Sequence, residues 1–328
     1  MVAQRQGKSL IDHEHLMVEL SAVIVAITGE EPRVLVLPSS GNGSDALPSG
    51  RLESRHRTLE AGLRSWVEHQ TLQSLGYVEQ LYTFGDRNRA AVESDKRQRV
   101  LSIGYLALVR EARSIGARGA AWRNWYRYFP WEDWRGGKPA VLARIERHLR
   151  GWIADAGSSA ERRSREQRAS TLFGLRHVPW SDERTLERYE FLFELGLVAE
   201  AHRDGAQAWA PAADTIREAA AMSADHRRIL ATAISRLRAK ITYRPVVFEL
   251  MPPRFTFLQL QRVVEALAGR RLHKSNFRRL VESEGLVEGT GEISSGAAGR
   301  PARLLRFRPE VLSERPAPGV RMPAARQR

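Results

Sequence analysis

The sequence predicts two domains: an α/β (α+β) N-terminal domain with a helical insertion, and a C-terminal winged helix-turn-helix domain. Two β-branched apolar runs and an amphipathic helical segment begin the chain, and this combination is typical of a helix-covered sheet. Near the other end, two short helical segments joined by a glycine turn precede two short strand segments. The distribution of charge also divides the chain in two.

Composition places the chain among globular proteins of a reducing compartment. Its 328 residues are 42% hydrophobic and include no cysteine. No apolar run approaches the ~20 residues needed to span a bilayer, and the first fifteen residues lack the apolar core of a secretory signal. We therefore expect a cytoplasmic protein with no membrane partner.

Positive charge is concentrated in the last third of the chain. Residues 226–328 hold 21 Lys and Arg against 8 Asp and Glu, whereas residues 1–225 hold 31 against 30. Nearly all of the net charge of +14 therefore lies in the C-terminal part. A neutral domain joined to a strongly basic one suggests that the basic part binds a polyanion. Solvated surface arginines would give the same charge, so the motifs have to decide.

The first 110 residues predict a sheet and one helix. We expect strands at 17–27, 33–37, 78–84 and 100–109, with a turn at 28–32. Apolar residues at helical spacing predict a helix over 58–75, which Gly76 would end.

A helical insertion is expected at about 120–222. It begins with a tryptophan-rich stretch that we interpret as insertion core or dimer interface, comprising Trp122, Trp125, Trp131, Trp134 and Trp152. The polar segment 155–170 is expected to interrupt its helices, which resume over 182–201 and end near Gly205.

Three regions are expected along the chain. The α/β domain and its insertion would occupy 1–222. A connecting helix capped by Asp225, followed by the winged helix, would occupy 223–310. The Pro- and Arg-rich segment 311–328 would be a disordered basic tail.

The strongest local pattern lies between residues 256 and 284. Thr256 and Gln259 have the spacing of a capping box. One apolar face follows at i, i+3, i+4 and i+7, formed by Leu260, Val263, Val264 and Leu267. Gly269 would end this helix, and a second helix is expected over 273–284. Two such helices joined by a glycine turn match a helix-turn-helix.

The second helix carries side chains that suit DNA bases. Phe277, Leu280 and Val281 share the face that should pack on the first helix. Arginine suits guanine, asparagine suits adenine, and the N-terminal part of a recognition helix enters the major groove. We therefore expect double-stranded DNA to be contacted by Lys274, Ser275, Asn276, Arg278 and Arg279.

The segment after Gly285 predicts a wing. Strands are expected at 286–288 and 302–307, with a glycine-rich connection between them. Arg300 and Arg303 are placed to meet phosphates or a minor groove. The alternative interpretation is a small α+β packing domain whose surface happens to be basic.

The helix expected over 58–75 also fits part of a catalytic motif. Counted from Gly50, the matching positions are Arg64, Trp66, Glu68 and Leu72. This is the register of the Nudix box, whose carboxylates hold Mg²⁺. His56, Ser65 and His69 stand where that box has glutamates, and Thr71 where it has glycine. Because Mg²⁺ prefers hard oxygen ligands, we expect neither a metal site nor catalytic residues here.

Longer segments carry a family resemblance. LYTFGDRNR (81–89) and VLSIGYLAL (100–108) resemble the second half of an ADP-ribose-type Nudix domain. About 80 residues, 225–307, resemble the linker and winged helix of the Nudix-related transcriptional regulators. The tryptophan-rich insertion and YEFLFELGLV (189–198) resemble the alphaproteobacterial NAD regulator (NadQ-like) subgroup.

The resemblance implies a sequence-specific transcriptional regulator, expected to repress NAD biosynthesis genes. It implies binding to a palindromic operator as a homodimer. The Nudix-like domain would be catalytically inactive and would sense an adenine nucleotide (NAD, ATP or ADP-ribose), with no cofactor required.

Residues from the two matching strands and the box are candidates for the nucleotide pocket. An aromatic ring could stack on adenine and arginines could hold the diphosphate. The candidates are Arg64, Tyr82, Phe84, Arg87, Arg99 and Tyr105. For Phe84 and Tyr105, which lie inside apolar strands, core packing is the stronger expectation.

Two other functions remain open from sequence. One is a Nudix-type nucleotide-diphosphate hydrolase with altered metal ligands, which would need carboxylates that converge on the pocket. The other is an RNA-binding module, which the shortage of aromatic residues in the basic domain disfavours.

Overall fold

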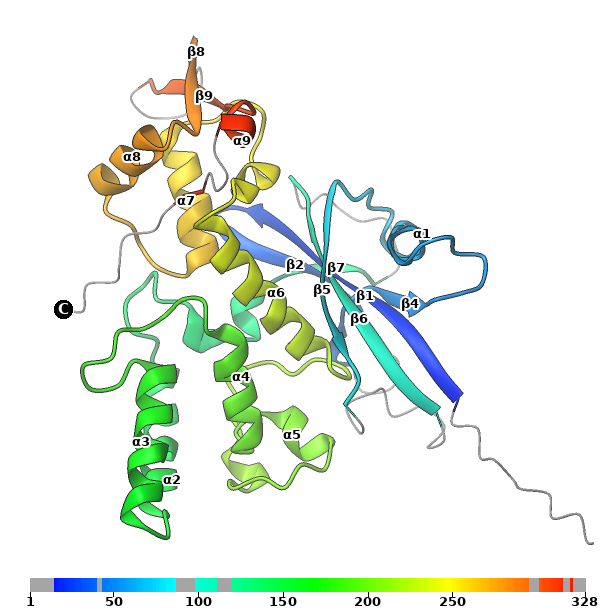
Figure 1. The fold of residues 1–328 in the computed structure, drawn as a ribbon, viewed down its shortest axis with the longest axis vertical. Helices are drawn as coiled ribbons and strands as arrows, with labels where there is room; N and C mark the ends of the chain where they lie inside the picture. Colours follow the sequence, from blue (N-terminus) through cyan, green and yellow to red (C-terminus); the bar gives the residue numbers. More distant parts are fainter. Residues whose placement is uncertain are drawn as a thin grey trace, which may run out of the picture.

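A mixed sheet of seven strands forms the centre of the part that the structure describes, which comprises residues 15–39, 43–86, 98–110, 119–294, 301–314 and 319–320. In this computed structural model the strand order is β3-β2-β1-β6-β5, with β4 added to β1 and β7 to β2 (Figure 1). The strands are β1 (His15–Thr28), β2 (Glu31–Pro38), β3 (Asp45–Ala46), β4 (Ser49–Arg51), β5 (Tyr77–Phe84), β6 (Gln98–Leu108) and β7 (Ala121–Asn124).

Strand β1 lies at the middle of the sheet. It runs parallel to β6 along 15–25, whereas its other pairings are antiparallel, with β4 at 19–21 and with β2 at 25–28. Gly29 and Glu30, both at positive φ, make the tight turn into β2. The four predicted strands are confirmed, and β7, which was expected to start the insertion, is an edge strand of the sheet.

Helix α1 (Leu59–Thr71) covers one face of the sheet (Figure 1). Thr58 caps it by accepting a hydrogen bond from the backbone N–H of Ala61, and Leu63 and Val67 are buried against the strands. The helix ends earlier than predicted. Leu72 takes the left-handed conformation at φ 56° and closes the helix, so Gly76 lies beyond it.

The insertion is more helical than the sequence indicated. Its elements are η1 (Trp125–Arg127), η2 (Pro130–Glu132), α2 (Val141–Ala154), α3 (Ser159–Phe173), α4 (Thr185–Glu194), α5 (Ala199–Arg203) and η3 (Ala212–Asp214). The predicted interruption at 155–170 is confirmed only over 155–158 and is wrong for the rest, because Ser158 caps α3 and the polar residues form the exposed face of that helix. The helix predicted over 182–201 is divided at Gly196, which has φ 77°.

Helix α6 (His226–Ile241) covers the second face of the sheet and lies between the strands and α4 (Figure 1). Asp225 precedes it, but its side chain makes no capping hydrogen bond. The domain boundary expected after residue 222 would assign α6 to the C-terminal region, although α6 packs on the sheet of the N-terminal region. One continuous hydrophobic core joins this face of the sheet, the insertion, α6 and the winged helix.

The last part of the chain is a winged helix. It consists of η4 (Val246–Leu250), α7 (Phe257–Ala268), α8 (Lys274–Ser283), β8 (Val287–Ile293) and β9 (Arg303–Phe307). The fold class predicted from sequence is confirmed. The described residues of the predicted disordered tail are structured, contrary to expectation: α9 (Val311–Glu314) buries Val311, and the backbone N–H of Val320 donates to Ile241 O at 2.7 Å. In the part of the chain that the structure describes, no helix is long and apolar enough to cross a membrane.

Candidate DNA-binding surface and ligand sites

The two helices of the helix-turn-helix are held by local signals that the sequence shows. Thr256 Oγ1 accepts from the backbone N–H of Gln259 at 3.2 Å, and Gln259 Oε1 accepts from the backbone N–H of Thr256 at 2.7 Å. The four predicted apolar residues of α7 are buried. On α8, Phe277 and Val281 are buried, and α7 is the helix against which α8 packs. This packing turns the other side of α8 outward.

The five residues predicted on the recognition face are all exposed: Lys274, Ser275, Asn276, Arg278 and Arg279. Arg278 is engaged, because its Nε donates to Glu282 at 2.9 Å and its guanidinium lies 5.0 Å from the ring centroid of Phe257. The side chains of Lys274 and Arg279 make no ion pair or hydrogen bond to any residue that the structure describes. They are therefore the cations of α8 most available to a phosphate or a base edge.

The wing is tied to the helices through its second strand. Phe255, just before α7, exchanges two backbone hydrogen bonds with Leu305 of β9 at 3.0 and 2.7 Å. Arg303 is exposed and pairs in register with Ile293 of β8. Arg300 lies outside the described residues. The contact of Arg303 with DNA stays a prediction.

Three donors from other parts of the molecule hold the C-terminal end of α7. The backbone N–H of Trp134 donates to Gly269 O at 2.6 Å, and the hydroxyl of Tyr126 donates to Ala266 O at 2.7 Å. Arg238 Nε donates to Leu267 O at 2.9 Å. The last carbonyls of a helix have no partner inside that helix, so these donors both satisfy them and anchor the turn before α8.

A buried ion-pair network lies behind this anchor. Glu132 accepts from Arg188 and from Arg238, each at 2.6 Å, and all three side chains are fully buried. Burial alone would raise the pKa of Glu132, but the charges of Arg188 and Arg238 outweigh it and hold that pKa below its usual value. The tryptophans nearby are core, as one of the two interpretations had it, since Trp125 and Trp131 are completely buried.

Helix α1, which corresponds to the helix of the Nudix box, retains the structural contacts of Gly50 and Arg64 but lacks most of the glutamates of that box. Gly50 is required there, because a Cβ at this position would lie 2.2 Å from the Trp66 ring. Arg64 donates to the carbonyls of Leu75 and Gly76 and pairs with Glu60 at 2.8 Å. Through these contacts, Arg64 stabilises the loop that follows α1. Among the described residues, no group of three or more His, Asp or Glu side chains is placed to hold a metal ion.

The structure does not bring the predicted pocket residues together. Tyr105 lies on the face of the sheet that α1 covers and donates to Gln80 Oε1 at 3.3 Å. Phe84 lies on the opposite face, beneath the Arg228 guanidinium. Tyr82 is 63% exposed, and Arg99 donates to Gly85 O at 3.2 Å. Arg87 lies outside the described residues. The five described residues therefore do not line one pocket in this arrangement.

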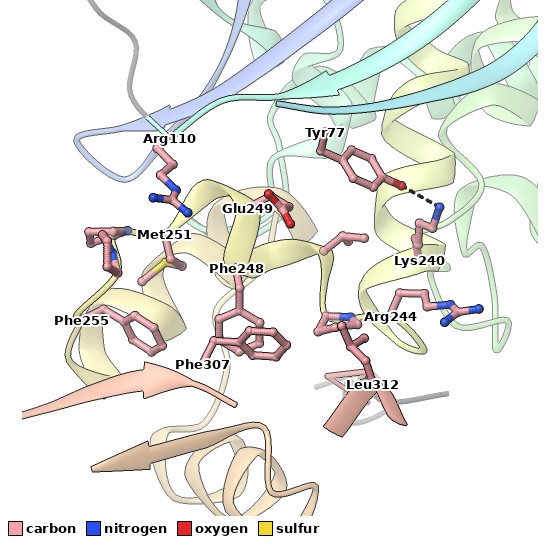
Figure 2. A pocket seen from close by; sticks show the side chains of 14 residues that line it. Tyr77, Arg110, Lys240, Arg244, Phe248, Glu249, Met251, Phe255, Phe307 and Leu312 are labelled. Carbon is pink, nitrogen blue, oxygen red and sulfur yellow. Dashed lines mark hydrogen bonds between the residues drawn. The ribbon is translucent and has the colours of Figure 1, made fainter. Parts of the chain in front are cut away.

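A groove that the sequence did not predict lies between the end of the sheet and the winged helix. It consists of two adjoining hollows of about 990 and about 450 Å³, which share Arg110, Glu249, Met251, Pro252 and Pro253. Figure 2 shows the smaller hollow, with Tyr77 and Arg110 on the side of the sheet and Phe248, Phe255 and Phe307 below. These residues come from four distant segments, so no local pattern could have revealed the groove.

Comparison with known proteins agrees with this architecture. Residues 247–307 match the family model described as the NrtR DNA-binding winged helix domain. The chain is 42% identical over 83 residues to the ADPR responsive transcriptional repressor NtrR of Acinetobacter baylyi. That match covers 25% of this chain and 33% of the relative's length.

Solved structures share the fold over most of the chain. Shewanella oneidensis NrtR complexed with a 27mer DNA aligns with a TM-score of 0.52 at 18% identity, covering 93% of this chain and 99% of that one. A MutT/nudix family protein from Enterococcus faecalis aligns with a TM-score of 0.52 at 15% identity, covering 93% and 90%.

Fold and surface together define a class: a Nudix-like α/β domain joined to a winged helix-turn-helix. Within that class, residues 247–307 form a DNA-binding winged helix of the NrtR family, and the chain as a whole shares the fold of the solved NrtR structure. The predicted family resemblance is confirmed. The assignment to the NadQ-like subgroup stays a prediction.

Proposed function

We propose that this protein is a transcriptional repressor that binds an operator through α8 and the wing and responds to an adenine nucleotide. The exposed cationic face of α8 carries the proposal. Lys274 and Arg279 project from a helix whose opposite face is locked onto α7, and they lack partners among the described residues. The DNA-binding family of residues 247–307 supports the same conclusion.

We infer that the operator is palindromic and that a homodimer binds it in the cytoplasm. A single recognition helix reads only a few base pairs, so two copies related by a two-fold axis are needed for a specific site. The spacing between the half-sites then has to match the distance between the two α8 helices. Genes of NAD biosynthesis are the expected targets, in line with the family resemblance.

The effector is proposed to be ADP-ribose, NAD or ATP. Support comes from the Nudix-like fold of the N-terminal part and from the Acinetobacter relative, which is an ADPR responsive transcriptional repressor. The effector would act by population shift. It would bind one placement of the winged helix better than another, and only one placement fits the operator.

We also propose that the Nudix-like domain does not hydrolyse the nucleotide. The positions occupied by His56, Ser65 and His69 cannot supply the carboxylates that the box needs for Mg²⁺. The neighbouring Glu60 is held by Arg64, and Glu53 is held by Arg55 at 2.5 Å. Incubation of the protein with ADP-ribose and Mg²⁺ should release no AMP, and steady turnover would contradict the proposal.

Fluorescence anisotropy tests the central claim. A labelled palindromic fragment from upstream of NAD biosynthesis genes is titrated with protein at two salt concentrations and then with each nucleotide. We expect tight, salt-sensitive binding that one nucleotide weakens or strengthens. A scrambled fragment of the same length is the control. Equal affinity for both fragments would remove the operator claim.

A further inference from the structure

We propose that the groove between the sheet and the winged helix is a binding site for an anionic nucleotide, with Arg110 holding its phosphates. The inference rests on the proposed function, because it gives the effector a location. That location differs from the pocket expected beside the box helix. It lies where a ligand would contact both the Nudix-like domain and the DNA-binding domain.

The size and shape of the groove suit a nucleotide. Its two hollows, of about 990 and about 450 Å³, adjoin each other, and small-molecule sites in proteins range over about 300–1,000 Å³. Both domains contribute apolar walls, which are Ile27, Leu108 and Val109 from the sheet and Leu250, Met251 and Val263 from the winged helix. Tyr77 and Phe307 are only partly buried, so they offer ring surface to a base.

Charge selects an anion. The groove is lined by Arg110, Lys240, Arg244 and Arg262, against the two carboxylates of Glu30 and Glu249. Lys240 is already neutralised by Glu79 at 2.5 Å, and Arg262 is engaged with Glu30 and Glu265.

Within the described part of the chain, two of these four cations remain available, Arg244 and Arg110, and Arg110 is the one that lines both hollows. It is exposed at the end of β6 and has no ion pair or hydrogen bond within the described part of the chain. Figure 2 shows its side chain extending from the sheet toward Glu249 and the smaller hollow. An arginine at this point could donate paired hydrogen bonds to a diphosphate, while the carboxylate of Glu249 could accept from a ribose hydroxyl.

Two leucines line the larger hollow without being buried. Leu72 is 66% exposed at a positive φ, and Leu258 is 55% exposed on the first turn of α7. A β-carbon at positive φ costs about 1 kcal/mol, and glycine would avoid this strain. Leu72, unlike a glycine at this position, offers an apolar side chain to a bound ligand.

The groove is placed where a ligand could move the recognition helix. It opens beside the N-terminal half of α7, where Leu258, Gln259 and Arg262 line it. The other end of α7 is anchored by Trp134, Tyr126 and Arg238. A ligand bound in the groove would therefore press on the N-terminal half of α7 while its C-terminal end stays anchored, and α8 would turn with it.

Calorimetric titration of the full chain with ADP-ribose, NAD and ATP tests the site. Arg110→Ala removes the proposed phosphate contact, and Leu258→Trp narrows the larger hollow. Arg147→Ala, an exposed arginine of α2, is the matched control. For whichever nucleotide binds wild type, we expect each groove variant to raise the Kd by about tenfold or more. The control variant should leave that Kd unchanged. Circular dichroism confirms that the variants are folded.

The outcomes separate the groove from the proposed function. If wild type binds a nucleotide and both groove variants bind it equally well, the groove is not the binding site. The proposal that the protein responds to a nucleotide would still stand. A loss of affinity in Tyr105→Phe alone would move the site to the α1 face of the sheet. If Leu258→Trp changes only the oligomeric state, the groove is an interface between copies. If wild type binds operator but none of the three nucleotides, the effector proposal and the groove both fall.

Discussion

Arg270 Nε lies 2.5 Å from Asp182 Oδ2, and this ion pair joins the turn of the helix-turn-helix to the insertion. Both side chains are largely buried, at 18% and 10% exposure. Beside them, the backbone of Trp134 holds the carbonyl of Gly269. The turn that aims the recognition helix is therefore supported from outside its own domain, and the insertion fixes the direction in which α8 points.

Gly269→Ala should disrupt this support. Gly269 has φ 74°, and a Cβ there would lie 2.3 Å from the carbonyl oxygen of Glu132. Backbone strain and the forced displacement together should lower the free energy of unfolding by about 2–4 kcal/mol. The control is Gly291→Ala, which also has positive φ but open space around it and should cost about 1 kcal/mol. Equal costs in urea denaturation would show that the close approach to Glu132 has no effect.

Glu132→Gln should be strongly destabilising, because it leaves Arg188 and Arg238 buried without a counter-charge. Breaking a buried ion pair by removing one partner costs about 3–5 kcal/mol. Glu218→Gln is the matched control, since its pair with Arg144 is exposed and should change stability by at most about 1 kcal/mol. If Glu132→Gln fails to fold, Arg270→Gln provides the graded test, because it removes the ion pair with Asp182 and leaves Glu132, Arg188 and Arg238 in place.

Arg279→Ala should weaken specific operator binding while nucleotide affinity stays unchanged. A side chain that contacts a base edge contributes about 1–3 kcal/mol, which corresponds to roughly a 5- to 150-fold loss. Arg278→Ala should cost less, because the Arg278 side chain already pairs with Glu282. Anisotropy with specific and scrambled fragments measures both variants. A loss in Arg279→Ala that is the same on both fragments would mean a phosphate contact rather than base recognition.

Acid should destabilise the protein through His226. Burial lowers the pKa of this histidine; the charge of Glu19 raises it in part, and Arg203 lowers it again. Because the folded pKa lies below the unfolded value of about 6.5, the stabilisation is complete above that pH and is lost as the pH falls toward the folded pKa. Protonation also removes the acceptor that Nδ1 offers to the backbone N–H of Leu47 at 3.0 Å.

His226→Asn tests this pH dependence, because its Oδ1 can still accept from Leu47. Urea midpoints of wild type and variant are compared at pH 7.5 and 5.5. We expect the wild-type free energy of unfolding to fall by about 1 kcal/mol more than that of the variant. Parallel pH profiles would assign the titration to other groups.

The helix-turn-helix could be predicted almost completely from sequence because its signals are local. A capping box joins two residues that are three positions apart, an apolar stripe extends over seven positions, and a glycine at positive φ ends a helix by itself. The same locality explains the errors elsewhere. Segment 159–170 has no apolar stripe for most of its length, yet the cap at Ser158 and the buried last turn of α3 make it helical.

The residues of a nucleotide pocket could not be found in this way. The alternation of side chains along a strand shows which residues share a face, but it does not show which face of the sheet that is. Phe84 and Tyr105 both come from apolar strands, and the pairing of β5 with β6 places them on opposite faces.

By itself, the sequence determined the class of protein: a neutral α/β domain with a damaged catalytic box, and a basic winged helix with a readable recognition face. Only the tertiary structure decided how the two parts are connected. Tyr126 reaches the carbonyl of Ala266 across 140 residues, and Glu132 meets Arg238 across 106. Contacts at such separations depend on the packing of the whole core, whereas helix caps and apolar stripes depend on neighbours within two turns.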